Sequence, residues 1–382
     1  MKLTQGRMID WGQQLILLIV VCSLFWFFGS NAAENIANLG IKSGFDFLDE
    51  RAGYDISFNL TNYISDDTYF DAYLAGVSNT VLVSFLSIIF ATVLGFIIGV
   101  GRVSQNWLVA KMTRAYVEVI RNIPLVVQLI WWYALCLTLP SVRKSINFGD
   151  TVFISNRGMV IPDISLNGWG SILFITLIVS ILAALSYRSW VKSKAKWVGF
   201  YSTIWPRCLA IALFPSLCII VYLSAIDAIS MTTPILKGFN FRHGVTVIPE
   251  LVALCIAISV YSSSYIAEIV RGCIQSVDKG QYETGHALGF KQAHIMWKLI
   301  VPQAVYPMIP QLTSVYLNII KNSSLGVVIG FMELVSSTGG TTLNNTGQAI
   351  ECILIVMATY CAFSLVTSLL MNWYNSKMAI GK

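Results

Sequence analysis

Polar side chains that could recognise a solute lie inside otherwise apolar stretches of this sequence. They are Asn79, Glu118, Arg121, Lys321, Asn322 and Glu351. Amide and charged groups inside a membrane segment are costly, and they often mark the route of an ion or solute. A structural role is the alternative for each of them. Glu118 and Arg121, for example, are three residues apart and could form an ion pair on one helix face.

A second candidate site is the polar stretch between Gln281 and Pro302, which separates two apolar segments. It reads Gln-Tyr-Glu-Thr-Gly-His-Ala-Leu-Gly, then nine residues, then Leu-Ile-Val-Pro. Its first part predicts two helical turns that end at Gly289 in the left-handed conformation, with the residues just before the glycine exposed. Lys291–Lys298 predicts a second short helix, and Pro302 is expected to mark the entry to the next apolar segment.

The polar stretch therefore predicts a helix–Gly–helix elbow that lies parallel to the membrane. Held between two apolar segments, a rigid elbow could transmit movement from a bound soluble partner to both of them. An ordinary amphipathic interfacial segment is the alternative.

The sequence contains no recognisable catalytic or metal-binding constellation. It has no Gly-x-x-x-x-Gly-Lys-[Ser/Thr] phosphate loop, no His-Glu-x-x-His and no Gly-x-Ser-x-Gly. Of the three histidines, His286 and His294 are eight residues apart without a further His or Cys beside them. The eight cysteines form no Cys-x-x-Cys pair. We therefore expect no enzymatic activity, no bound metal and no cofactor held by this chain.

The elements that must position these residues are membrane helices. The chain has 382 residues, of which 56% are hydrophobic and only 12% charged. Soluble domains carry about 25% charged residues. Eight segments approach the roughly 20 apolar residues that cross a bilayer as a helix: Trp11–Phe28, Tyr73–Val100, Tyr116–Leu139, Trp169–Leu185, Leu209–Ala225, Ile248–Ile269, Gln303–Ile320 and Ala349–Met371. The fold class expected is an all-α polytopic membrane protein, without a nucleic-acid partner.

The basic residues of the loops predict the orientation of these helices. Alternate loops carry about sixteen against about eight Lys and Arg residues, and the more basic loops stay in the cytoplasm. Both termini and the stretch Gln281–Pro302 are therefore expected to be cytoplasmic. The first external loop, residues 29–72, is rich in Asp and Glu.

Several further patterns describe how the chain is organised. Trp169–Asp227, with two of the segments, could be removed without changing the alternation, which indicates an insertion. The external loops on either side of it, Thr151–Pro162 and Phe239–Pro249, are each apolar–turn–apolar, which predicts hairpins turning at Gly158 and Gly244. These hairpins are either decoration or a docking surface for an external protein. The apolar run Val327–Val335 is too short to span and is expected to be re-entrant or interfacial.

Close helix packing is also predicted. Gly95 and Gly99 share one face of their segment, and small residues at this spacing allow a second helix to approach.

The spacing Glu283-Thr-Gly, three residues, Gly289, nine residues, Leu299-Ile-Val-Pro302 resembles the "EAA" loop of ABC-importer permeases. It departs from that pattern at Thr284 and Gly285, where the family has alanines. Other stretches look like the polar amino-acid permeases of the histidine/glutamine/arginine type: Asn79-Thr-Val-Leu-Val-Ser, Tyr116-Val-Glu-Val-Ile-Arg-Asn-Ile-Pro-Leu, Tyr265-Ile-Ala-Glu-Ile-Val-Arg-Gly and Lys321-Asn-Ser-Ser-Leu. The resemblance covers most of residues 73–373 and is closest to the Q-type permease subunit of general L-amino-acid transporters.

The resemblance implies a type I ABC-importer permease core of five helices in residues 73–140 and 247–373. To this core the chain adds an N-terminal helix (1–28), a periplasmic acidic loop (29–72) and an inserted helix pair with periplasmic loops (141–246). Residues 271–302 would form the cytoplasmic ATPase-coupling loop. The residues implied in that contact are Glu283, Thr284, Gly285, Ala287, Leu288, Gly289 and Pro302.

The implied partners are a second, related permease as a heterodimer, two cytoplasmic ABC ATPases and a periplasmic binding protein that delivers an L-amino acid. ATP and Mg would be used by the ATPases, and the chain would reside among the lipids of the bacterial inner membrane. An amino-acid zwitterion needs one cationic partner and one anionic or carbonyl partner. The six polar residues in the apolar segments, Asn79, Glu118, Arg121, Lys321, Asn322 and Glu351, supply both kinds.

Two other function classes fit less well. An ion-coupled secondary transporter often has paired broken helices, whereas only the region Lys321–Val335 is interrupted here. A membrane scaffold would not need charges such as Glu118 and Lys321 inside its spans.

Overall fold

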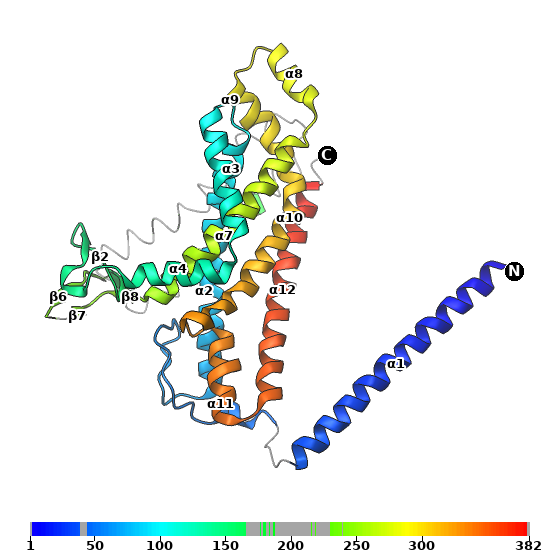
Figure 1. Ribbon diagram of the computed structural model, residues 1–382, viewed down its shortest axis with the longest axis vertical. Helices are drawn as coiled ribbons and strands as arrows, with labels where there is room; N and C mark the ends of the chain where they lie inside the picture. The colour runs from blue at the N-terminus through cyan, green and yellow to red at the C-terminus, as the bar shows by residue number, and fades with distance from the viewer. Residues whose placement is uncertain are drawn as a thin grey trace. The chain divides into compact units, whose positions relative to one another are not determined.

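The computed structural model describes residues 2–38, 44–165, 230–238 and 240–379, together with a few isolated residues between 176 and 218 (Figure 1). The predicted pair Trp169–Leu185 and Leu209–Ala225 falls almost entirely outside the described residues. The chain divides into two compact units: residues 1–134 with 250–382, called unit 1, and residues 135–249, called unit 2.

Unit 1 is helical. Its α-helices are α1 (Lys2–Asn38), α2 (Tyr69–Arg102), α3 (Trp107–Asn122), α4 (Leu125–Leu137), α7 (Pro249–Gln275), α8 (Lys279–Ala287), α9 (Gln292–His294), α10 (Val301–Asn322), α11 (Leu343–Thr346) and α12 (Ala349–Ala379). A π-helix, Ile295–Ile300, joins α9 to α10, and a second one, Val335–Thr342, precedes α11. The 3-10 helices are Asp46–Asp49 and Ser323–Ile329. Helices α4 and α7 each cross a unit boundary by a few residues.

Five of the described helical stretches are long and apolar enough to cross a membrane. They are Gly12–Asn31, Tyr69–Arg102, Pro249–Gln275, Gln292–Ile329 and Ala349–Ser376. Counting the α3–α4 pair as one span gives six. Five of the eight predicted segments thus coincide with these stretches, and a sixth coincides with the bent pair. The chain is a multi-pass membrane protein.

The predicted segment Tyr116–Leu139 is not one straight helix, because α3 and α4 are bent by 103°. The cause is Pro124, which disfavours the helical conformation at the residue before it; Ile123 has φ −96° and ψ 125°. Gln128 binds carbonyl groups that the break leaves without helical partners. Its Nε2 donates to the carbonyl oxygens of Ile120 and Ile123 at 2.9 and 3.0 Å.

Helices α2 and α7 pack closely at the two predicted glycines. A Cβ atom on Gly95 would lie 2.6 Å from the Cβ of Ile266, and one on Gly99 would lie 2.6 Å from the Cβ of Val270. Real side chains do not come this close. The prediction that Gly95 and Gly99 allow close helix approach is therefore confirmed.

Residues 44–68 form a packed segment at the start of α2, on the side of unit 1 where α11 lies (Figure 1). Phe47, Ile56 and Tyr63 are buried in a cluster that includes residues of α2 and α12. The Tyr63 hydroxyl donates to the carbonyl oxygen of Tyr54 at 2.6 Å. Segment 44–68, which lies within the predicted acidic loop 29–72, therefore has an apolar core and carries its charged residues on the surface.

The described residues of unit 2 form eight short strands: β1 (Ile146–Phe148), β2 (Val152–Ser155), β3 (Gly158–Ile161), β4 (Asp163–Ser165), β5 (Ser230–Thr232), β6 (Ile235–Lys237), β7 (Asn240–Arg242) and β8 (Val245–Val247). The 3-10 helix Val142–Lys144 precedes them. They form a sheet in the order β1-β2-β3-β8 and two pairs, β4-β5 and β6-β7. All described pairings are antiparallel.

One of the two predicted hairpins is confirmed and the other is wrong. Strands β2 and β3 form a hairpin in which Gly158 has φ +108°. Strands β7 and β8 do not pair with each other, since β7 pairs with β6 and β8 with β3. His243 and Gly244 both have positive φ, and the chain between β7 and β8 passes from one sheet to the other instead of closing a hairpin.

Candidate functional site

The polar stretch predicted as an elbow begins with α8. The Asp278 side chain accepts a hydrogen bond from the Gly280 N–H at 2.6 Å and so caps the helix. At the other end Gly289 has φ +74°. The Phe290 N–H donates to the Gly285 carbonyl at 3.1 Å and the Gly289 N–H to the His286 carbonyl at 2.9 Å. These are the two bonds of a Schellman motif, and the predicted left-handed Gly289 is confirmed.

Helix α8 folds back onto the helix that follows it. Gly285 is buried, and a Cβ atom there would lie 2.8 Å from Cγ1 of Ile295. Gln303 Nε2 also donates to Gln281 Oε1 at 3.3 Å. The contact with Ile295 explains why this chain has a glycine where the resembling loop has an alanine. Residues 278–295, which are called the α8 hook below, are therefore fixed to the start of α10.

Pro302 lies in the first turn of α10, but helical structure begins earlier in the chain. It starts at Gln292 and runs without interruption through the π-helix into α10. In a regular α-helix the ring of Pro302 would clash with the carbonyl of Lys298, and the wider π-turn leaves room for it. The second arm of the predicted elbow is therefore the beginning of the membrane helix itself.

The outward face of the α8 hook combines charge with an apolar tip. Glu283, Thr284, Ala287 and Gly289 are exposed. The Leu288 side chain is 65% exposed, which is unusual for leucine outside a lipid-facing helix. Half-burial raises the pKa of the neighbouring Tyr282 phenol, so this side chain stays neutral.

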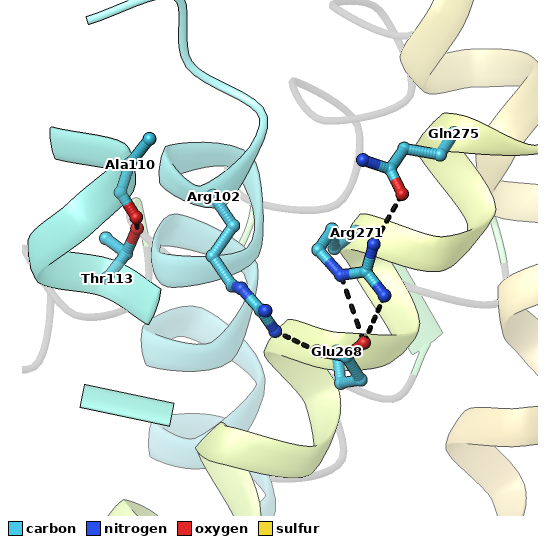
Figure 2. A network of polar contacts seen from close by, with 6 residues as sticks. All are labelled: Arg102, Ala110, Thr113, Glu268, Arg271 and Gln275. Carbon is cyan, nitrogen blue, oxygen red and sulfur yellow. Dashed lines mark hydrogen bonds and ion pairs between the residues drawn. The ribbon is translucent and has the colours of Figure 1, made fainter. Parts of the chain in front are cut away.

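A charged network joins α2 to α7 near the hook (Figure 2). Arg102 forms an ion pair with one carboxylate oxygen of Glu268, and Arg271 binds the other, with a distance of 3.0 Å from its Nε. Arg271 also donates to Gln275, the last residue of α7. Sequence reasoning missed this network. The spacing of Glu268 and Arg271 was a usable signal, but nothing in the sequence indicates Arg102 as the third member.

Two of the predicted pathway residues hold the packed segment 44–68 in place. Asn79 is fully buried, and its Nδ2 donates to the carbonyl oxygens of Phe58 at 2.7 Å and Met332 at 2.8 Å. Glu351 accepts a hydrogen bond from the Gly44 N–H at 2.9 Å. Both residues therefore make structural contacts, and their part in a substrate pathway stays a prediction.

The predicted ion pair between Glu118 and Arg121 is wrong. The Arg121 guanidinium lies over the ring of Tyr265 instead, with its carbon 4.9 Å from the ring centre. Glu118 is exposed, and so is Lys321, while Asn322 is half-buried at the end of α10. Among the described residues no hydrogen bond or ion pair joins any two of the six predicted pathway residues.

Glu333 is a buried carboxylate that sequence reasoning did not single out. Its Oε2 accepts from the Val335 N–H at 2.9 Å and from the Tyr360 hydroxyl at 3.2 Å, and its Oε1 accepts from the Ser336 N–H at 2.9 Å. The Leu334 N–H next to it donates to Thr80 Oγ1 at 3.1 Å. A carboxylate just before a helical segment is a recognisable capping signal, although its complete burial could not be inferred.

The described residues contain no group of three or more His, Cys, Asp or Glu side chains that could hold a metal ion. At the α3–α4 bend they form an apolar cavity of about 320 Å³. It is lined by Ile120, Ile123, Val127, Gln128, Trp131 and Trp132.

Comparison with known proteins identifies the family. Residues 207–380 match the family "Binding-protein-dependent transport system inner membrane component". The chain is 43% identical to an amino-acid ABC transporter permease protein, YhdX of Escherichia coli, over 97% of this chain and 94% of that protein. It is 40% identical to the general L-amino acid transport system permease protein AapQ of Rhizobium johnstonii, over 96% of this chain and 91% of that one.

A third relative is the glutamate/glutamine/aspartate/asparagine transport system permease protein BztB of Rhodobacter capsulatus. The two are 36% identical over 96% of this chain and 93% of BztB. The similarity to all three extends over nearly the full length of this chain. The chain therefore belongs to the family of binding-protein-dependent transport system inner membrane components, as a relative of amino-acid ABC transporter permeases.

Proposed function

We propose that this chain is the permease subunit of an ATP-binding-cassette importer that carries L-amino acids from the periplasm into the cytoplasm. Its full-length relatives are named as permeases of amino-acid transport. The observation that carries the proposal is the α8 hook, a rigid, exposed helix end joined to a membrane helix. An ion-coupled secondary transporter has no comparable support.

The hook is the site where the ATPase docks. Glu283, Thr284, Ala287, Leu288 and Gly289 present its exposed surface. Gly285 does not face the ATPase; its buried contact with Ile295 fixes the orientation of α8. Pro302 follows the π-helix and lies in α10, the helix that the hook would move. ATP and Mg are bound by the separate ATPase, in agreement with the lack of a phosphate loop in this sequence.

The orientation follows from this assignment. The hook and both termini face the cytoplasm, and the packed segment 44–68 faces the periplasm, in the bacterial inner membrane. The subunit acts as a heterodimer with a related permease, together with two ATPases and a periplasmic binding protein. Since α7 separates β8 from α8, the strands of unit 2 that directly precede α7 emerge on the periplasmic side.

The substrate pathway uses fewer of the predicted residues than the sequence suggested. Asn79 and Glu351 hold the segment 44–68. Arg121, Glu118, Lys321 and Asn322 are at least partly exposed and lie on α3 and at the end of α10, where the second permease would complete a pathway.

The test is co-purification of the cognate ATPase with the permease pair carrying Leu288→Asp. Charge at the centre of an apolar contact should weaken ATPase association by about 10- to 100-fold and abolish uptake in proteoliposomes. Leu60→Asp is the matched control, since Leu60 is 57% exposed and lies at the opposite end of unit 1. The control should bind ATPase normally.

Equal ATPase binding by both variants would refute the docking assignment. Uptake by the permease alone under an ion gradient, without ATPase, would refute the proposed function as a whole.

A further inference from the structure

The four-stranded sheet of unit 2 has two different faces. The ring of Phe153 in β2 lies 4.8 Å from the ring of Phe241 in β7, so the β6–β7 pair covers one face. Val160 of β3 pairs with Phe153 and is buried on the same face. Because alternate residues of a strand point to opposite sides of a sheet, the side chains between these positions belong to the other face.

That other face, called the apolar sheet face below, consists of apolar side chains only. The strand register places one row across the four strands: Ile146, Ile154, Met159 and Val247. The second row, two residues along each strand, is also apolar and ends at Phe148 and Val245. None of these side chains is buried, and Phe148 is 57% exposed. A sheet face in contact with water normally carries polar residues, so this face is expected to have an apolar partner.

One end of the sheet brings together three parts of the chain. The Asn156 N–H in the β2–β3 turn donates to the carbonyl of Pro140, which precedes β1, at 2.9 Å. A Cβ atom on Gly158, at the other side of the same turn, would overlap the carbonyl oxygen of Val247 at the end of β8. The approach to β1, the β2–β3 turn and the exit from β8 therefore lie at the same end of the sheet.

The charges of unit 2 are separated along the strands. Lys237 pairs with Asn240, whose Oδ1 accepts a hydrogen bond from Arg157 in the β2–β3 turn at 2.8 Å. Both carboxylates of the described part of unit 2, Asp150 and Asp163, lie at the opposite end, beyond β1 and β3. The end with the β2–β3 turn, called the cationic end below, carries exposed basic residues: Arg143, Lys144, Arg157 and Lys237.

The chain enters the membrane from the cationic end. Ile248 alone separates β8 from Pro249, the first residue of α7. Helix α7 has 27 residues and is therefore about 40 Å long, close to the roughly 40–45 Å of a bilayer with its headgroups. The end of β8 thus emerges at the level of the lipid headgroups, where phosphates are the nearest anions.

The size of the apolar sheet face distinguishes between possible partners. Four strands about 4.8 Å apart, with about three residues that each rise about 3.3 Å, give a footprint of roughly 200 Å². A stable interface between two proteins takes about 800 Å² on each partner. The face is therefore too small to hold a separate protein, whereas a sheet already tethered to a membrane helix needs little more to stay on the bilayer.

We propose that the apolar sheet face lies on the lipid bilayer and that the cationic end binds the headgroups of anionic phospholipids. Ile146, Phe148 and Val245 enter the boundary between headgroups and acyl chains, while Lys144 and Arg157 contact phosphates. The contact holds unit 2 against the membrane where α7 begins. Only its assignment to the periplasmic leaflet rests on the proposed function.

The test compares adjacent residues that point to opposite faces of the sheet. Single cysteines carry a nitroxide label in the full-length permease within its complex, in a background whose native cysteines are replaced by alanine. Ile146→Cys lies on the apolar sheet face, and Asn147→Cys is the matched control on the opposite face. In nanodiscs that contain phosphatidylglycerol, the label at Ile146 should be more accessible to lipid-dissolved oxygen than to a water-soluble nickel chelate. The label at Asn147 should show the reverse.

A second pair on β8, Val245→Cys and Thr246→Cys, repeats the comparison if a change in β1 disturbs folding. Equal accessibility of the two positions in the folded pairs would overturn the inference. Protection of the apolar position from both reagents would overturn it too, because a protein surface would then cover this face.

The cationic end is tested by Lys144→Gln combined with Arg157→Gln. One cation near an anionic membrane surface changes binding by about fivefold, so the ratio of docked to undocked sheet should fall by about 30-fold. Nanodiscs of phosphatidylcholine alone should reproduce the loss. Arg242→Gln is the matched control, since Arg242 lies towards the opposite end of the sheet and should not affect lipid contact.

Lipid contact of the Ile146 label that is unchanged in the double variant, or unchanged in phosphatidylcholine alone, would overturn the inference. The charge-retaining pair Lys144→Arg with Arg157→Lys should keep the contact, and an equal loss in that pair would overturn the inference as well. ATP-driven amino-acid uptake by the unmodified complex is measured in parallel. If that uptake is absent, the proposed function fails, while the labels still decide whether the sheet lies on lipid.

Discussion

The two ends of unit 1 are held together by different kinds of polar contact. At the α11 end, Glu333 and Asn79 are fully buried and bind mainly backbone N–H and C=O groups. At the α8 end, Arg102, Glu268 and Arg271 bind one another through side chains, and the Glu268 side chain remains 30% exposed. Buried bonds to the backbone cannot be broken without leaving orphaned groups, whereas the Arg271–Glu268 ion pair, with both side chains 30% exposed, can exchange with water. The α11 end is therefore built to stay fixed and the α8 end to rearrange.

The strongest test of this comparison is Glu333→Ala. The change leaves the Val335 and Ser336 N–H groups and the Tyr360 hydroxyl without their acceptor, so the free energy of unfolding should fall by about 3 kcal/mol or more. Thermal unfolding of the detergent-purified protein measures this loss. If Glu333→Ala lowers the melting temperature no more than Glu268→Ala does, the proposed difference in rigidity between the two ends is wrong.

The next effect is expected in the α8 hook. Gly285→Leu pushes a side chain into Ile295 and should cost about 1 to 3 kcal/mol of local packing, with loss of ATPase association. Binding to immobilised ATPase measures the result. Gly285→Ala alone should also weaken ATPase association, because its Cβ atom meets Ile295. The double variant Gly285→Ala with Ile295→Ala removes this clash and should recover association. Normal association of Gly285→Leu would show that the hook is not fixed by this contact.

A pH dependence of stability is expected at the α11 end. Burial raises the pKa of the Tyr63 phenol above its ordinary value of 10.0, and burial also raises that of Tyr54. The neutral phenol is therefore favoured in the folded state. Its contribution to stability is complete below about pH 10 and is lost as the pH rises towards the folded pKa.

Melting temperatures between about pH 8 and pH 11 should fall more steeply for the unmodified protein than for Tyr63→Phe. At pH 8 that variant should lose about 1 kcal/mol, because the bond to the Tyr54 carbonyl is gone. Parallel curves for the two proteins would contradict the assignment.

The smallest effect on stability is expected for Glu268→Ala, about 1 kcal/mol or less, since the triad is partly exposed. Its effect should instead be on coupling, measured as the ratio of amino acid transported to ATP hydrolysed. Added salt should mimic the variant by screening the ion pairs. A large stability loss with unchanged coupling would show that the α8 end is as rigid as the α11 end.

The sequence predicted the parts of this molecule that depend on local conformation. Gly289 indicated the end of α8, and Gly95 with Gly99 indicated close helix packing, because each signal lies within one element. Hydropathy located the membrane segments for the same reason.

Contacts between distant parts of the chain left no such signal. Nothing near Gly285 indicated that Ile295 would pack on it, and Arg102 is 166 residues from Glu268. In segment 44–68 the apolar residues Phe47, Ile56 and Tyr63 follow no helical or strand period, so their common core could not be inferred. Hydropathy continues through Pro124, so it marks one segment over Tyr116–Leu139 and gives no sign of the bend between α3 and α4.

The π-helix at Ile295–Ile300 has a consequence for the direction in which α8 points. A π-turn amounts to one additional residue in an α-helix, and one residue corresponds to about 100° of rotation about the helix axis. Deleting a residue from this stretch would turn the hook by about 100° around α10, and it would also remove the wider turn that accommodates the Pro302 ring. The direction in which the α8 hook points is thus set by a single residue of helical phase.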